Sequence, residues 1–127
     1  MSEAKPGPLT KLELEIMQAI WRNGPGNAGA VQQALRQPLA YTTVQTMLNI
    51  LVRKGHLRRE LEGRAYVYSA VVSEARASGR AVRDLVERMF GGSSEALVMS
   101  LVKNRQLDAG KIAELARRLE EEKGGGQ

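Results

Sequence analysis

The sequence predicts a mostly α-helical chain with one small β-hairpin, in the order three helices, hairpin, three helices. Apolar residues recur at helical spacing in six stretches, and only residues 57–70 alternate with a period of two. The length of 127 residues allows one domain with an accessory segment but not two full cores. We therefore predict an N-terminal domain of residues 1–72 and a C-terminal helical segment of residues 73–127, which ends in a flexible glycine-rich tail.

The first two helices are predicted from their ends. Thr10 and Glu13 have the spacing of a capping box, and the apolar pattern that follows continues to about Arg22. Asn27 can cap a second helix of about two turns, which Pro38 prevents from running on.

A third helix over residues 40–54 has one apolar face and ends at the glycine that follows it. The period of two then predicts strands at residues 57–61 and 65–70, joined by a turn at Glu62 and Gly63. Because an isolated hairpin is only marginally stable in water, one face of it must lie on the preceding helices. Three helices followed by such a hairpin are typical of a helix-turn-helix domain with a wing.

Composition narrows the classes of function. Lys and Arg number 19 against 14 Asp and Glu, a net charge of +5, which favours an anionic partner such as nucleic acid. With no Cys and one His, we expect no metal site, no cofactor and no catalytic role. A hydrolase built on Asp84, Glu87 or Asp108 is disfavoured, because surface charge or helix capping explains all three. No apolar run reaches the roughly 20 residues that span a bilayer, so we expect a cytoplasmic protein without membrane contact.

The outer face of the third helix is polar but uncharged, which suits entry into the major groove of DNA. Amide side chains can bond base edges, and carboxylates, which would repel phosphate, are missing from this helix. A solvated face that binds nothing is the alternative, and the basic residues between 53 and 64 favour DNA. The predicted DNA-binding residues are Tyr41, Thr42, Thr43, Gln45, Thr46, Asn49, Arg53, Lys54 and Arg64.

The remaining aromatic residues and the histidine have simpler interpretations. We expect Trp21 to belong to the core or to cover the hairpin, and Tyr66 and Tyr68 to pack from one strand face. Tyr41 can equally contact a DNA backbone or seal the turn before the third helix. We expect His56 to be a solvated loop residue or the neighbour of a phosphate.

The C-terminal segment has more apolar surface than so short a piece can bury by itself. Its three helices begin at the capping residues Ser73, Ser93 or Ser94, and Asp108. A second copy is the simplest partner, since a two-fold contact buries each stripe against its equivalent. The alternative is a helical cap folded back on the same chain. The predicted dimer contacts are Val82, Leu85, Val86, Met89, Phe90, Leu97, Val98, Leu101, Ile112, Leu115 and Leu119.

Three stretches together resemble the BlaI/MecI penicillinase-repressor family of winged-helix transcription factors. They are the run from Leu12 to Trp21, the stretch from Thr43 to Leu48 followed by Leu51, Lys54 and Gly55, and the wing from Glu62 to Tyr68. The resemblance covers nearly the whole chain. It implies a homodimeric repressor that binds a palindromic operator. A winged-helix module that binds another protein is the alternative function.

The resemblance also implies roles for single residues. Thr43 and Gln45 would read bases, with Thr42 beside them and Arg64 on the DNA backbone. The family's usual Ser-Pro-Lys is replaced here from Ala40 to Thr42, and Ile50 stands where an arginine is usual, so operator preference is expected to differ.

Regulation in the family suggests a further expectation. In its penicillinase branch, a signal from a membrane sensor leads to cleavage of an Asn-Phe bond in the dimer-forming part, and the matching bond here is Ser100–Leu101. A sensor-linked protease is therefore a candidate partner, although the motif itself is not kept. The copper branch uses C-terminal cysteines, which this chain lacks.

Overall fold

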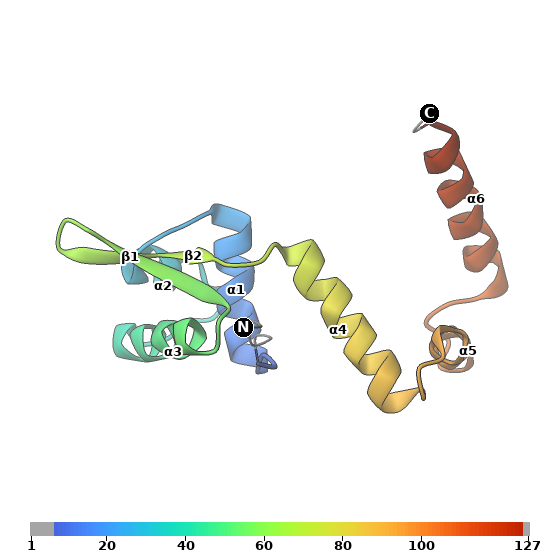
Figure 1. Ribbon diagram of the computed structural model, residues 1–127, viewed down its shortest axis with the longest axis horizontal. Coiled ribbons are helices and arrows are strands. Elements are labelled where there is room, and N and C mark those ends of the chain that lie inside the picture. Colours follow the sequence, from blue (N-terminus) through green and yellow to red (C-terminus); the bar gives the residue numbers. More distant parts are fainter. Residues whose placement is uncertain (1–6, 126–127) are drawn as a thin grey trace, which may run out of the picture. The chain divides into compact units, whose positions relative to one another are not determined.

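The computed structural model describes residues 7–125, and within them it contains six helices and one hairpin (Figure 1). This is the predicted element order, so the predicted fold class is confirmed. The bounds are α1 Lys11–Asn23, α2 Ala28–Ala34, α3 Tyr41–Arg53, β1 Leu57–Glu62, β2 Ala65–Ala70, α4 Glu74–Met89, α5 Ser94–Lys103 and α6 Ala109–Gly125. None of these helices combines the length and the apolar character needed to cross a membrane.

The chain forms two compact units, Met1–Ser78 and Gly79–Gln127, which we call the N-terminal and C-terminal units. The division lies inside α4, later than the boundary at residue 72 that the sequence suggested. The start of α4, up to Ser78, therefore belongs to the N-terminal unit. Gly124 and Gly125, expected in a flexible tail, extend α6, and Gly126 and Gln127 lie outside the described residues.

The N-terminal unit is organised around the buried face of α3. Val44, Leu48 and Leu51 are fully buried, one helical turn apart, and they share a core with Ile16 and Met17 of α1. Burial of these side chains supplies the main stabilisation of the three-helix arrangement. Because one face of α3 is fully used by the core, its other face is held outward.

The helix ends follow the capping residues identified in the sequence. The Thr10 hydroxyl accepts from the Glu13 backbone N–H at 3.2 Å, and the Glu13 carboxylate accepts from the Thr10 N–H at 3.0 Å. The Asn27 side chain accepts from the Ala30 N–H at 2.8 Å at the start of α2. After α3, Gly55 has a φ of 88° and lets the chain turn directly into β1.

The hairpin pairs one residue further toward its tip than the sequence suggested. Glu62 pairs with Ala65, so the turn consists of Gly63 and Arg64, and not of Glu62 and Gly63. Gly63 has a φ of 64°, which is the conformation that a two-residue type II′ turn requires at its first central position. At the other end, Gly26 bridges to Tyr68 through two backbone hydrogen bonds of 2.9 and 3.1 Å. The turn geometry therefore puts Arg64 at the tip of the wing, our name for β1, β2 and their turn.

One ion pair links the start of α1 to the end of α3. Lys54 Nζ lies 2.7 Å from Glu13 Oε1, and the Glu13 residue is only 5% exposed. Burial raises the pKa of the Glu13 carboxyl, but hydrogen bonds from Lys54 and Thr10 outweigh it, so the net pKa lies below the ordinary value of 4.5. Lys54 is therefore a structural cation of the N-terminal unit.

Glu13→Gln is expected to lower the free energy of unfolding at pH 7 by about 1–2 kcal/mol, because the charge-assisted bond to Lys54 is lost. The pKa of Glu13 is lowered on folding, so its carboxylate stabilises the parent above the ordinary pKa of 4.5 and ceases to do so as the pH falls through the lowered value. The difference between the two proteins should therefore shrink as the pH falls below 4.5 and through the lowered pKa of Glu13. Urea unfolding at several pH values measures this.

Glu15→Gln is the matched control, since Glu15 lies on the same helix but accepts from Gln37 rather than from a cation. If Glu15→Gln and Glu13→Gln changed stability and its pH dependence alike, the special role of the Glu13–Lys54 pair would be wrong.

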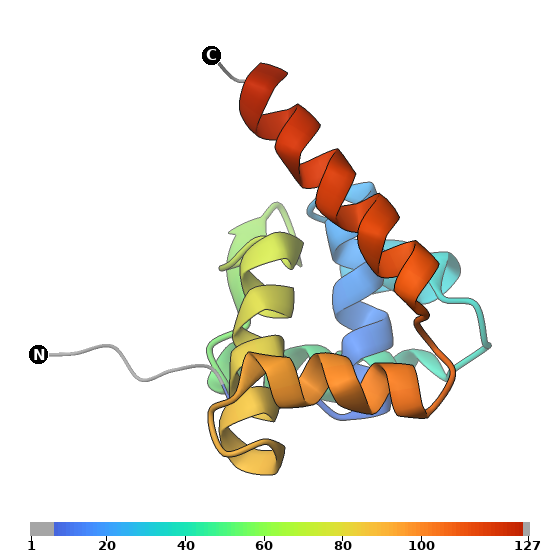
Figure 2. The same cartoon turned by 90° about the vertical axis from the view of Figure 1, so that its right-hand side faces the viewer.

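The helices α4, α5 and α6 each begin at a capping residue and cover one another little. Ser73 accepts from the Arg76 N–H at the start of α4, Ser93 from the Ala96 N–H, and Asp108 from the Lys111 N–H at 2.8 Å. Figure 2 shows α5 running across the end of α4. Every residue from 109 to 124 in α6 is exposed, so the described part of α6 has no buried face.

Candidate nucleic-acid interface

The outward face of α3 is a continuous polar surface. Thr42, Thr43, Gln45 and Thr46 are all exposed, and Tyr41 at the start of the helix is 46% exposed. The helix contains no acidic residue, and its basic residue Arg53, at the other end, is also exposed. The core residues of α3 leave this face free, so the structure presents hydroxyl and amide groups without a repelling charge.

A groove of about 300 Å³ connects this face to the wing. We call it the α3 groove. The start of α2 forms one wall, α3 contributes Tyr41 and Gln45, and the wing contributes Arg64 and Tyr66. Three of the predicted DNA-binding residues, Tyr41, Gln45 and Arg64, thus line one surface although they are far apart in the sequence.

Arg64 is free to meet an anion from outside the chain. It is exposed at the wing tip, and within residues 7–125 it forms no ion pair. A guanidinium at the end of a hairpin can reach a phosphate without burying a charge in the protein.

Two of the predicted binding residues are already engaged. Lys54 is paired with Glu13, as described above. The Oδ1 atom of Asn49 accepts from Arg59 Nη1 at 2.7 Å and from the Tyr68 hydroxyl at 3.3 Å. These contacts leave Asn49 only its NH₂ group for a ligand, so it is poorly suited to bond both polar atoms of an adenine edge.

The sequence did not reveal that Arg59 would bind the side chain of Asn49. Arg59 is one of the basic residues between 53 and 64, and nothing in its spacing points to α3. Its contact with Asn49 depends on how the hairpin packs on the helix. The start of α2 was also missed as a wall of the α3 groove. The available signal was that α2 is the first helix of the helix-turn-helix, which in this motif crosses the DNA backbone.

The expectation for His56 was wrong. It is 6% exposed, its Nε2 contacts the carbonyl oxygen of Gly7, and its Nδ1 has no partner among the described residues. Gly55 turns the chain inward and carries His56 under the N-terminal segment. The two strand tyrosines also differ: Tyr68 is 4% exposed in the core, whereas Tyr66 is 42% exposed. Trp21 covers the core as expected, and its Nε1 donates to the Val72 carbonyl at 3.0 Å.

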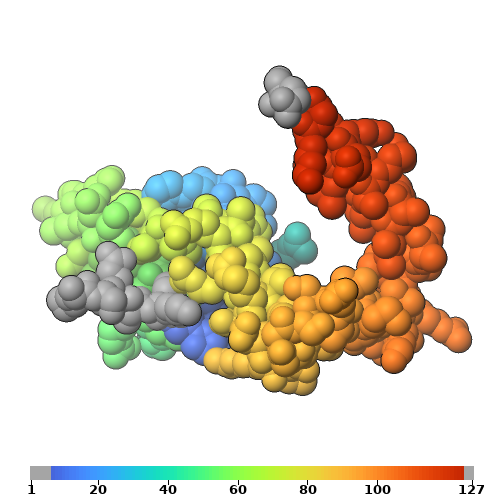
Figure 3. Space-filling model, turned by 45° about the vertical axis from the view of Figure 1, so that its right-hand side comes forward, coloured from blue at the N-terminus to red at the C-terminus, as the bar shows by residue number. Residues whose placement is uncertain are grey.

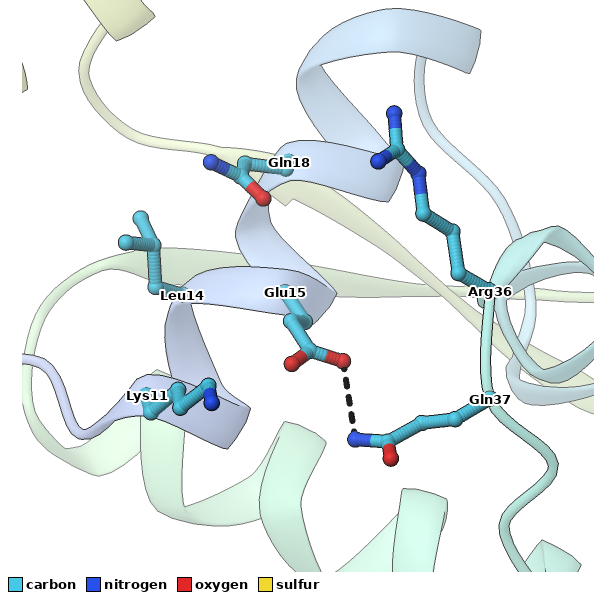
Figure 4. Close-up of a pocket in the computed structure, with 6 residues that line it drawn as sticks. All are labelled: Lys11, Leu14, Glu15, Gln18, Arg36 and Gln37. Carbon is cyan, nitrogen blue, oxygen red and sulfur yellow. Dashed lines mark hydrogen bonds between the residues drawn. The ribbon is translucent and has the colours of Figure 1, made fainter.

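A second hollow, of about 450 Å³, lies between α1 and the loop before α3 (Figure 4). In it Gln37 donates to Glu15 at 3.0 Å, and the exposed residues Lys11 and Arg36 also line it. The hollow shares no residue with the α3 groove. Among the described residues, no group of three or more metal-ligating side chains occurs there or elsewhere.

Most of the predicted dimer contacts are exposed apolar side chains. Val86, at 8% exposure, is the exception because it is already buried within the chain, and Phe90, Leu97 and Leu101 are half-buried. The space-filling view shows α6 uncovered along the side that faces the viewer (Figure 3). The exposed members are Val82, Leu85, Met89, Val98, Ile112, Leu115 and Leu119, joined by Met99.

Residues 9–121 match the sequence profile of a known family, described as penicillinase repressor. The chain belongs to the penicillinase repressor family. A penicillinase repressor of Bacillus licheniformis is 32% identical over 117 residues, which cover 91% of either chain. The methicillin resistance regulatory protein MecI of Staphylococcus aureus strain N315 is 21% identical, over 84% of this chain and 89% of its own.

One solved structure adds to the sequence match. The DNA binding domain of the repressor BlaI is 33% identical and superimposes with a TM-score of 0.52, over 57% of this chain and 92% of that domain. The family resemblance seen in the sequence is therefore confirmed, together with the winged-helix fold.

Proposed function

We propose that this member of the penicillinase repressor family is a DNA-binding transcriptional repressor, and that the polar face of α3 and the wing form its DNA-binding surface. The observation that carries this assignment is the exposed, carboxylate-free face of α3 next to Arg64, which lines the same groove and forms no ion pair with any residue that the structure describes. Relatives named penicillinase repressor and MecI, and the BlaI DNA binding domain, support the same function.

The exposed residues of α3 differ in the parts of DNA that they can bind. Gln45 is exposed, and its amide, which has no hydrogen-bond partner between residues 7 and 125, can bond the edge of an adenine. The threonines offer a methyl to thymine or a hydroxyl to phosphate. Arg64 would neutralise a phosphate from the wing. Catalysis has no part in this proposal, and neither does a cofactor or a metal.

A homodimer completes the proposal. The exposed apolar side chains of α4, α5 and α6 suit burial against a second copy, and two DNA-binding surfaces related by two-fold symmetry match a palindromic operator. We place this repressor in the cytoplasm, where it meets bacterial promoters.

Selection of binding sites from random duplexes tests the function directly. We expect an enriched sequence with two mirror-related half-sites at a constant spacing. The competing function, a winged-helix module that binds an acidic protein, predicts no enriched sequence and only a shallow dependence of duplex binding on salt. Absence of enrichment would contradict the repressor assignment.

Arg64→Ala is expected to weaken binding to all duplexes by a similar factor, because a phosphate contact carries no sequence information. The slope of log K against log salt should fall by about 0.9. Mobility shifts on specific and random duplexes at several salt concentrations measure both effects. Arg36→Ala, which removes the same charge from the separate hollow, should leave the slope unchanged; an equal effect of both substitutions would argue against Arg64 as a phosphate contact.

Cleavage of Ser100–Leu101 by a sensor-linked protease stays a prediction. The bond lies inside α5, where the Ser100 carbonyl accepts from the Asn104 backbone N–H at 3.0 Å and from its side chain at 2.8 Å. Proteases bind their substrates unwound, so we propose that cleavage requires local opening of α5. A cut there would separate α6 from the operator-binding unit and weaken binding through loss of the second copy.

A further inference from the structure

The wing is fastened to α3 by a small network centred on Arg59. Arg59 Nη1 donates to Asn49 Oδ1 at 2.7 Å, and its guanidinium carbon lies 4.4 Å from the centre of the Tyr66 ring. The Tyr68 hydroxyl donates to the same Asn49 oxygen at 3.3 Å. One arginine of β1 therefore touches both the recognition helix and the second strand of the wing.

The register of the hairpin explains why these side chains meet. Arg59 pairs directly with Tyr68, and Leu61 pairs with Tyr66, so all four lie on one face of the two strands. Tyr66 is the diagonal neighbour of Arg59, within reach for a cation–π contact. This face is the one that packs on the helices, since Tyr68 belongs to the core.

Besides this network, the buried contacts of the wing that the structure describes lie at its base, not near its tip. In β1 only Leu57 is buried, and Leu61 near the tip is 63% exposed. The backbone bridge between Gly26 and Tyr68 holds the base of the hairpin, and the tip projects from the helices (Figure 1). Paired strands that lack a packed face are only marginally stable, and here this applies to the tip half of the hairpin. The last contact before the tip therefore determines how freely the tip moves.

We propose that Arg59 is a positioning residue, which holds the wing against α3 through Asn49 and so presents Arg64 at a constant distance from Gln45. The restraint of the wing is a property of the free protein. Only its effect on operator binding rests on the proposed DNA-binding function. Arg59 acts by lowering the cost of ordering the wing on DNA, and not by touching a phosphate itself.

Two properties separate positioning from a direct phosphate contact. Loss of a phosphate contact reduces the salt slope by about 0.9, whereas loss of a restraint reduces affinity with the slope unchanged. A restraint that works through Asn49 also makes the effects of Arg59 and Asn49 substitutions non-additive.

The experiment compares Arg59→Met, which keeps the stem but not the donors, with Arg58→Met. Arg58 is the matched control, since it precedes Arg59 in β1, is exposed, and alternates to the other strand face. In the free full-length protein, ¹⁵N relaxation should show the order parameters of Leu61 and Gly63 falling from about 0.85 toward 0.6 in Arg59→Met and staying unchanged in Arg58→Met.

Operator binding provides the second measurement. Arg59→Met should weaken it roughly 3- to 10-fold with an unchanged salt slope. Asn49→Ala should cost a similar factor, and the double variant little more than either single one. The proposal is overturned if Arg59→Met leaves the wing rigid, if it lowers the salt slope as Arg64→Ala does, or if the two losses multiply. Should the parent bind no duplex at all, the repressor function fails, and the relaxation data alone still decide the role of Arg59.

Discussion

Leu119→Glu is expected to convert the protein from a dimer to a monomer and to reduce its affinity for a full operator by roughly 10²- to 10⁴-fold. Leu119 is 61% exposed on α6, so the substitution buries no charge within the chain and leaves its folding intact. In a dimer, the new carboxylate would lie unpaired in an apolar contact, which is costly. Affinity for a single half-site should not change.

Sedimentation velocity at micromolar concentration and titration of full and half operators measure the two effects. Arg118→Gln serves as the control, because it changes the net charge by the same one unit. Arg118 itself occupies an exposed polar position of α6. If Leu119→Glu remains a dimer, α6 does not belong to the interface. If the monomer binds the full operator as tightly as the parent, the two-fold model of recognition is wrong.

Gln45→Ala is expected to cost about 1–3 kcal/mol of discrimination at one base pair of each half-site. Gln45 is exposed, lines the α3 groove and has no hydrogen-bond partner among the described residues, so its amide is available to a base. Its loss should relax the preference at that position and leave the salt slope unchanged, in contrast to Arg64→Ala.

Competition with duplexes substituted at each position locates the affected base pair. Gln18→Ala is the matched control, because Gln18 is an exposed glutamine of α1 that lines the separate hollow. Retention of the parental preference at every position by Gln45→Ala would remove Gln45 from the readout, even if Arg64 still binds phosphate.

The order of the elements and most of their ends could be predicted from local signals. The Thr10–Glu13 capping box, the Asn27 cap and the period change at residue 57 each depend on residues a few positions apart, and such interactions form in the same way in many folds. The turn lies one residue later than predicted, because Glu62 pairs with Ala65 and so continues the strand. This pairing depends on the partner strand and not on local sequence.

The polar face of α3 was also visible in the sequence, because a helix with an apolar stripe must turn its other residues outward. Which members of that face are free was not. Lys54 and Asn49 look as available as Arg53 and Gln45 in the sequence, and they are engaged only because Glu13 and Arg59 approach from other elements. His56 is a similar case, since the chain that covers it lies far from it in sequence.

The sequence by itself therefore determined the fold class, the absence of acidic residues from the recognition helix and the exposed apolar stripes of the C-terminal helices. The tertiary structure decided which polar groups form contacts within the chain and which, such as Gln45 and Arg64, are available to a ligand. The physical reason is range: helix periodicity and capping act over a few residues, whereas a side chain's hydrogen-bond partner is chosen by long-range packing.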